Sequence, residues 1–138
     1  MKGRVPNKEN RPSYIDCAIQ LGYDVEVDVR YINNQFWLGH DTPDYKVSVE
    51  WLNKRKDKLW IHCKDIQSSQ RLTSLPVNFK FFCHSNDPYI LTSTGHLWVH
   101  DLTLNLDNQC IIPLLSENEI KSNKINYIYA VCTDYVLL

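Results

Sequence analysis

The sequence predicts an α/β fold in a single domain, residues 1–138. Short runs rich in Val, Ile, Phe and Trp alternate with helical patterns, and such continuous apolar runs are typical of strands buried on both faces. A chain of 138 residues can bury one sizeable core but not two. The number of strands favours a (β/α)₈ barrel, whose usual length is ~250 residues. We therefore expect a reduced barrel in which loops replace several helices.

The first predicted elements are a helix and the strand that follows it. Pro12 suits the first turn of a helix over 11–21, and Gly22 ends that helix. Its apolar face comprises Tyr14, Ile15, Ala18 and Ile19. Residues 23–29 alternate strictly, so the valines face one way and the acids the other.

The remaining elements follow from the same patterns. Apolar runs predict strands over 36–39, 59–63, 79–83, 89–92, 96–99, 110–114 and 127–132. Helical spacing predicts helices over 47–56, 66–75 and 117–124.

Composition excludes several classes of partner. The 15 basic and 16 acidic side chains give a net charge of −1 without a basic stripe, which argues against nucleic acid. No run approaches the ~20 apolar residues needed to cross a membrane, so we expect a cytoplasmic protein.

The five cysteines form no C-x-x-C pair and lie mostly in apolar runs, so we expect buried, reduced thiols.

Glu26 and Asp28 lie two positions apart on the 23–29 strand, so their carboxylates share a face. Facing an interior, two such anions need a cation between them, and hard carboxylate oxygens favour Mg²⁺ or Ca²⁺. An edge strand with a solvated acidic face explains the alternation equally well.

Histidines end several of the predicted strands. His40 follows the 36–39 strand, His62 and Lys64 share a face at the end of the 59–63 strand, and His84 follows the 79–83 strand. α/β enzymes place their chemistry at the carboxyl ends of strands, so these residues are candidates for a metal or anion site. Taken singly, a Gly-His-Asp turn is more often a surface turn, and His62 is more often a hydrogen-bonded core histidine.

Taken together, three motifs give the chain a resemblance to the glycerophosphodiester phosphodiesterase family. These are Glu9-Asn10 before the first helix, the strand carrying Glu26-Val27-Asp28-Val29, and Gly39-His40-Asp41, with His40 14 positions after Glu26. The resemblance implies a phospholipase-C-like barrel that hydrolyses a small phosphodiester with the help of a divalent cation. The resemblance is dense over 9–64 and thin beyond.

The resemblance also implies roles for individual residues. Glu26 and Asp28 would bind the metal, His40 would be a catalytic histidine, and Lys64 would hold phosphate charge. His62 stands where the family has a third acidic ligand, so the metal set would include an imidazole. Further substrate-binding residues are expected at Glu9, Asn10, His84 and Trp98.

The sequence also departs from the family. The family's His-Arg-Gly motif is missing upstream of Glu9, so a barrel here would lack its first strand and one catalytic histidine. Three hypotheses follow. The chain is a small metal-dependent phosphodiesterase, a non-catalytic binding protein that keeps the anion and metal pocket, or an unrelated α/β domain whose motif matches are accidental.

Overall fold

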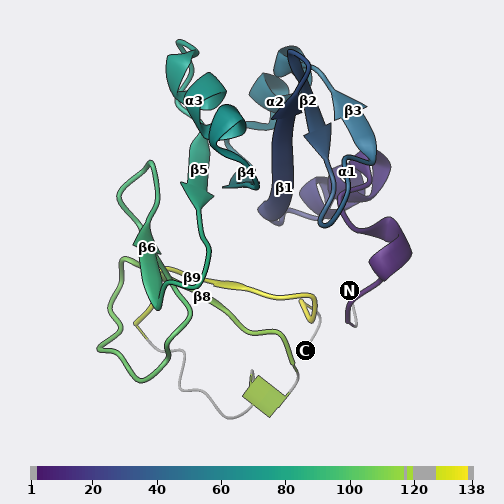
Figure 1. The fold of residues 1–138 in the computed structure, drawn as a ribbon. Coiled ribbons are helices and arrows are strands. Elements are labelled where there is room, and N and C mark those ends of the chain that lie inside the picture. Colours follow the sequence, from purple (N-terminus) through teal and green to yellow (C-terminus); the bar gives the residue numbers. More distant parts are fainter. Residues whose placement is uncertain (1–2, 117, 120–126, 137–138) are drawn as a thin grey trace. The chain divides into compact units, whose positions relative to one another are not determined.

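The computed structural model describes residues 3–116, 118, 119 and 127–136 (Figure 1). These residues form two compact units. The larger is Asn7–Ser85, and the smaller comprises the described residues of Met1–Pro6 and Asn86–Leu138. Each unit has a sheet of its own.

The larger unit contains a five-stranded mixed sheet in the order β3-β2-β1-β4-β5 (Figure 1). Its strands are β1 (Val25–Ile32), β2 (Gln35–Leu38), β3 (Tyr45–Val47), β4 (Leu59–Cys63) and β5 (Lys80–Cys83). β1, β4 and β5 are parallel, whereas β2 is antiparallel to both β1 and β3. Asn33 and Asn34 join β1 to β2 with φ of 51° and 59°, the left-handed conformation that two-residue hairpin turns require.

Three α-helices belong to this unit. They are α1 (Pro12–Gln20), which follows the 3-10 turn η1 (Pro6–Lys8), α2 (Val49–Arg55) and α3 (Ile66–Ser74). Side chains cap two of them, because Ser48 accepts a hydrogen bond from the Trp51 backbone and Asp65 accepts one from the Ser68 backbone. These helices confirm the predictions over 11–21, 47–56 and 66–75.

The helices pack on one face of the sheet. Ile15 of α1, Leu52 of α2 and Leu72 of α3 are buried in one cluster with Val27 and Ile61. Since side chains alternate along a strand, residues 26 and 28 of β1 and residue 62 of β4 belong to the opposite face. Burial of the valines by the helices therefore decides which face carries the acids.

The smaller unit contains a four-stranded sheet in the order β6-β7-β8-β9. Its strands are β6 (Tyr89–Leu91), β7 (Leu97–Val99), β8 (Cys110–Pro113) and β9 (Ala130–Cys132). β6 is antiparallel to β7, and β7, β8 and β9 are parallel. The helix expected over 117–124 lies mostly outside the described residues.

The prediction of a reduced (β/α)₈ barrel is wrong. The described residues form two separate mixed sheets, one ending at β3 and β5 and the other at β6 and β9, so neither closes. A parallel barrel needs a crossover of a dozen or more residues between neighbouring strands. The two-residue Asn33-Asn34 turn is too short for that and makes β2 an antiparallel partner. Within the part of the chain that the structure describes, no helix is long and apolar enough to span a membrane.

Candidate metal centre

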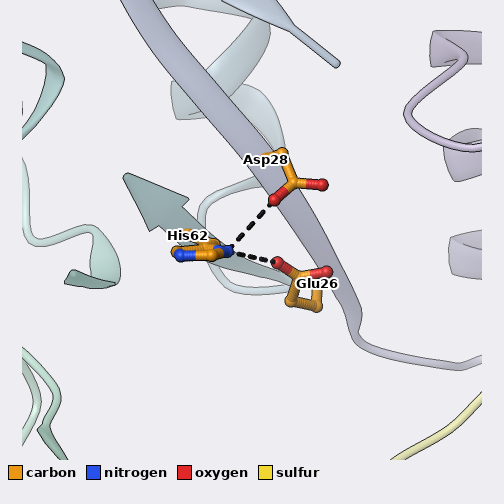
Figure 2. A group of neighbouring side chains, drawn as sticks. All are labelled: Glu26, Asp28 and His62. Atoms are coloured by element: carbon orange, nitrogen blue, oxygen red, sulfur yellow. Dashed lines mark ion pairs between the residues drawn. The ribbon is translucent and has the colours of Figure 1, made fainter. Parts of the chain in front are cut away.

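Glu26, Asp28 and His62 come together on the helix-free face of the larger unit's sheet (Figure 2). The parallel register of β1 and β4 pairs Asp28 with His62, and Glu26 lies two residues earlier on the same face of β1. His62 Nδ1 lies 3.1 Å from Asp28 Oδ1 and 3.7 Å from Glu26 Oε1. The three ligand atoms lie within 4.8 Å of one another.

These distances suit a single ion. Neighbouring ligands of an octahedral cation with ~2.1 Å bonds lie about 3 Å apart, and those of the larger Ca²⁺ lie slightly further apart. Two carboxylates and one imidazole form a mixed oxygen and nitrogen donor set, which several divalent cations accept. The residues present therefore fit a divalent cation.

The side chains of the cluster are largely buried. The side chain of Asp28 is 5% exposed, compared with 15% for His62 and 27% for Glu26. Two carboxylates this close repel each other at low dielectric unless positive charge lies beside them. Lys64 supplies part of that charge, since its Nζ lies 3.4 Å from Asp28 Oδ1.

Asn10 fixes the orientation of the Asp28 carboxylate. Its amide nitrogen donates to Asp28 Oδ2 at 2.9 Å, and its amide oxygen accepts from the Asp28 backbone N–H at 2.8 Å. Asn10 has φ of 56°, a conformation that asparagine tolerates better than most residues. Asp28 Oδ2 is thus held by the amide, while Oδ1 is directed at His62 and Lys64.

The environment keeps Asp28 ionised. Burial by itself would raise the pKa of this carboxyl, but hydrogen bonds with His62 and Asn10 and the charge of Lys64 outweigh burial and lower the pKa. Asp28 is therefore a carboxylate at neutral pH, the form that binds a cation.

Two aromatic neighbours hold the ring of His62. It stacks on Phe82, its register partner on β5, with ring centroids 5.1 Å apart and planes 6° apart. The ring of His84 lies 5.7 Å from the His62 ring. Nδ1 of His62 faces both carboxylates (Figure 2), so either a proton or a cation must lie there to avoid lone-pair repulsion.

The structure brings His40 near the backbone of this cluster but not into it. The Gly39 N–H donates to the Asp28 carbonyl, so the loop after β2 begins beside β1. The imidazole of His40 is half exposed, has Asp41 as its partner at 2.9 Å, and lies outside the group of three ligand atoms. His40 is therefore not one of the three clustered ligands, and its role as a catalytic histidine stays a prediction.

The other expected substrate-binding residues belong to both units. Lys64, Asn10 and His84 surround the cluster, as described above. Glu9 precedes Asn10 and is half-buried, but its carboxylate is not one of the three clustered ligands. Trp98 lies on β7 in the smaller unit and is 5% exposed.

Sequence reasoning overlooked Arg30, which shapes the His40 loop. Its guanidinium donates to the carbonyl oxygens of Gly39, His40 and Asp41. Arg30 follows Asp28 by two positions, so the alternation that paired Glu26 with Asp28 also places Arg30 on this face.

Comparison of the chain with protein-family models, with curated proteins and with solved structures found no match. The resemblance to phosphodiesterases consequently rests on the quoted motifs, and function must be argued from the geometry of Glu26, Asp28 and His62.

Proposed function

We propose that Glu26, Asp28 and His62 bind Mg²⁺ or Ca²⁺ and that the chain hydrolyses a phosphodiester. A glycerophosphodiester is the substrate class that the motifs favour, giving an alcohol and glycerol phosphate as products. The observation that carries the proposal is the set of three ligand atoms within 4.8 Å of one another on the paired strands β1 and β4.

The chain's own residues suit an anionic substrate. A bound divalent cation would neutralise charge on a phosphoryl oxygen. Lys64, already 3.4 Å from Asp28, is a second cation at the same place and suits a neighbouring phosphate oxygen. Asn10 keeps Asp28 aligned, and the stack on Phe82 keeps His62 aligned.

Hydrolysis also requires a proton-transfer group. Water oxygen attacks phosphorus, the bond from phosphorus to the leaving alkoxide breaks, and one proton must reach that alkoxide. We assign this transfer to His40, whose Nδ1 is held by Asp41 at 2.9 Å, because a carboxylate partner fixes the orientation of the ring.

A non-catalytic binding protein is the second candidate function. The observation that favours it is the position of His40, half exposed and outside the metal cluster. On this alternative the chain binds a cation and a phosphodiester without cleaving the ester.

Cation binding is tested first, by calorimetry with Ca²⁺ and by electron paramagnetic resonance with Mn²⁺. We expect Asp28→Asn and Glu26→Gln to weaken binding at least about tenfold, the scale of losing a charged ligand. Asp24→Asn is the matched control, because Asp24 precedes Glu26 by two positions on the same face and pairs instead with Lys58 and Lys80. Equal affinity in Asp28→Asn and Asp24→Asn would refute the metal site.

Catalysis is tested separately, by incubating the full chain with glycerophosphocholine or bis(p-nitrophenyl) phosphate with and without EDTA. The enzyme hypothesis predicts hydrolysis that stops with EDTA and falls in His40→Gln, while Ca²⁺ affinity in that variant is unchanged. Cation binding without any hydrolysis would support the binding protein instead.

A further inference from the structure

Two cysteines lie side by side at the carboxyl ends of β4 and β5. The parallel register of these strands pairs Cys63 directly with Cys83. Neighbouring strands lie about 4.8 Å apart, within the Cα separation of about 4.4–6.8 Å that a disulfide spans. Paired residues point to the same face, so these two thiols are directed alike.

Ser69 of α3 lies beside both thiols. Burial raises the pKa of the Cys63 thiol, and the hydroxyl of Ser69 and the thiol of Cys83 lie near enough to influence that pKa as well. The same Ser69 hydroxyl lies 2.8 Å from Cys83 Sγ. Ser69 on α3 therefore contacts the Cys83 sulfur and lies beside Cys63, so the two register partners share one neighbour.

The two thiols differ in their access to solvent. Cys83 is exposed, whereas Cys63 is 4% exposed. A dissolved oxidant therefore meets Cys83 first, and Cys63 is positioned to react with the oxidised sulfur.

We propose that Cys63 and Cys83 form a reversible intramolecular disulfide when the protein meets a hydroperoxide. The Cys83 sulfur attacks the peroxide, the O–O bond breaks, and Cys83 becomes a sulfenic acid with release of water or alcohol. The Cys63 sulfur then attacks the Cys83 sulfur, the S–O bond breaks, and water leaves. Two thiols thus supply two electrons to the peroxide, and a dithiol reductant reverses the reaction.

The disulfide does not depend on the proposed function, because its geometry involves only β4, β5 and α3. It has a local consequence for the metal cluster all the same. His62 directly precedes Cys63, and His84 directly follows Cys83. Closing the bond fixes the separation of the strand ends that carry these two rings.

The experiment uses the full, reduced chain treated with hydrogen peroxide, followed by alkylation and peptide mass spectrometry. We expect a peptide linking Cys63 to Cys83, with loss of two hydrogens, which disappears on treatment with dithiothreitol. The linked peptide should be absent from Cys83→Ser and from Cys63→Ser, and at least about tenfold more abundant than any other cysteine pair.

Cys17→Ser is the matched control, because Cys17 is also exposed but lies on α1. This variant should form the disulfide as the parent does. Cys83→Ser removes an exposed thiol, so it keeps the test valid even if substitution of buried Cys63 impairs folding. Peroxide treatment that leaves Cys63 fully alkylated, or that stops at a dimedone-reactive sulfenic acid on Cys83, would overturn the proposal.

Discussion

The Asn10 side chain holds both the carboxylate and the backbone of Asp28, at 2.9 Å and 2.8 Å. Asn10, two residues before α1 begins, thereby orients a proposed metal ligand on β1, 18 positions later in the chain. Because the amide donates through nitrogen and accepts through oxygen, its two contacts also determine which way the amide is turned.

Asn10→Gly should weaken cation binding without disturbing the turn. Glycine accepts the φ of 56° freely, so the variant loses the amide contacts while keeping the backbone conformation. Removing a group that orients a metal ligand commonly costs about 10–100-fold in affinity, and we expect the lower part of that range. Calorimetry with Ca²⁺ measures the effect. The control is Asn34→Gly, because Asn34 is exposed and its φ of 59° suits glycine equally well. Asn53→Gly would not serve, since glycine would weaken helix α2. Equal affinity in the two variants would contradict the role of Asn10.

Lys64→Met should have opposite effects on the two ligands of the site. The ammonium group near Asp28 Oδ1 repels a cation and attracts an anion, so its removal should raise Ca²⁺ affinity and lower phosphodiester affinity, each by about three- to tenfold. Calorimetry with Ca²⁺ and with glycerophosphocholine gives both values. Lys46→Met, on an exposed position of β3, is the control and should change neither. A parallel change in both affinities would show that Lys64 acts through structure rather than charge.

Asp16 should stabilise the fold at neutral pH and lose this effect in acid. The Arg55 side chain donates two hydrogen bonds to Asp16, at 2.6 Å and 2.9 Å, and thereby lowers the pKa of the carboxyl. A carboxyl whose pKa is lower in the folded state stabilises the fold in full at pH values above its unfolded pKa of about 3.9. This contribution disappears as the pH falls through the folded pKa.

Urea unfolding of Asp16→Asn at several pH values tests this relationship. Since the pair is partly exposed, the free energy of unfolding at pH 7 should fall by about 1 kcal/mol or less. The difference from the parent should shrink below about pH 4. Asp57→Asn, at an exposed position after α2, is the control. A destabilisation that stays constant down to pH 2 would contradict the assignment to charge.

Gly39→Ala should destabilise the protein more than Gly22→Ala. Both glycines have positive φ, at 150° and 95°. A Cβ at Gly39 would overlap the carbonyl oxygen of Thr42, whereas a Cβ at Gly22 meets no atom within 4 Å. In both variants the alanine must adopt an unfavourable positive φ. We expect Gly39→Ala to lower the free energy of unfolding by at least about 1 kcal/mol more than Gly22→Ala does. Denaturant unfolding checks this, and equal losses would mean that the loop adjusts.

The sequence predicted local features well because their causes are local. Alternation of valine and acid over 23–29 correctly separated the face of β1 that packs against the helices from the face that carries Glu26 and Asp28. The expectation that these carboxylates meet His62 is likewise confirmed. Side-chain alternation along β1 and the parallel pairing of β1 with β4 are sufficient to bring the three side chains together.

The strand order and the surroundings of the cluster could not be predicted from the sequence, because they depend on contacts between residues far apart in the chain. The barrel was inferred from the number of strands, which does not reveal that β2 returns through a two-residue turn. The short strand β3 was missed, because three residues give too little alternation to recognise. The partners of His40 were not predicted, because strand periodicity does not reveal that its imidazole pairs with Asp41 and that Arg30 holds its loop.

The alternation of β1 links the proposed cation binding to correct strand pairing. A shift of one residue along β1 would turn Glu26 and Asp28 toward Ile15, Leu52 and Leu72, and would bring the valines to the other face. Such a misregistered chain would have similar secondary structure but no metal ligands. A titration with Mn²⁺ would then count the molecules in a preparation that have reached the native register, which circular dichroism could not distinguish.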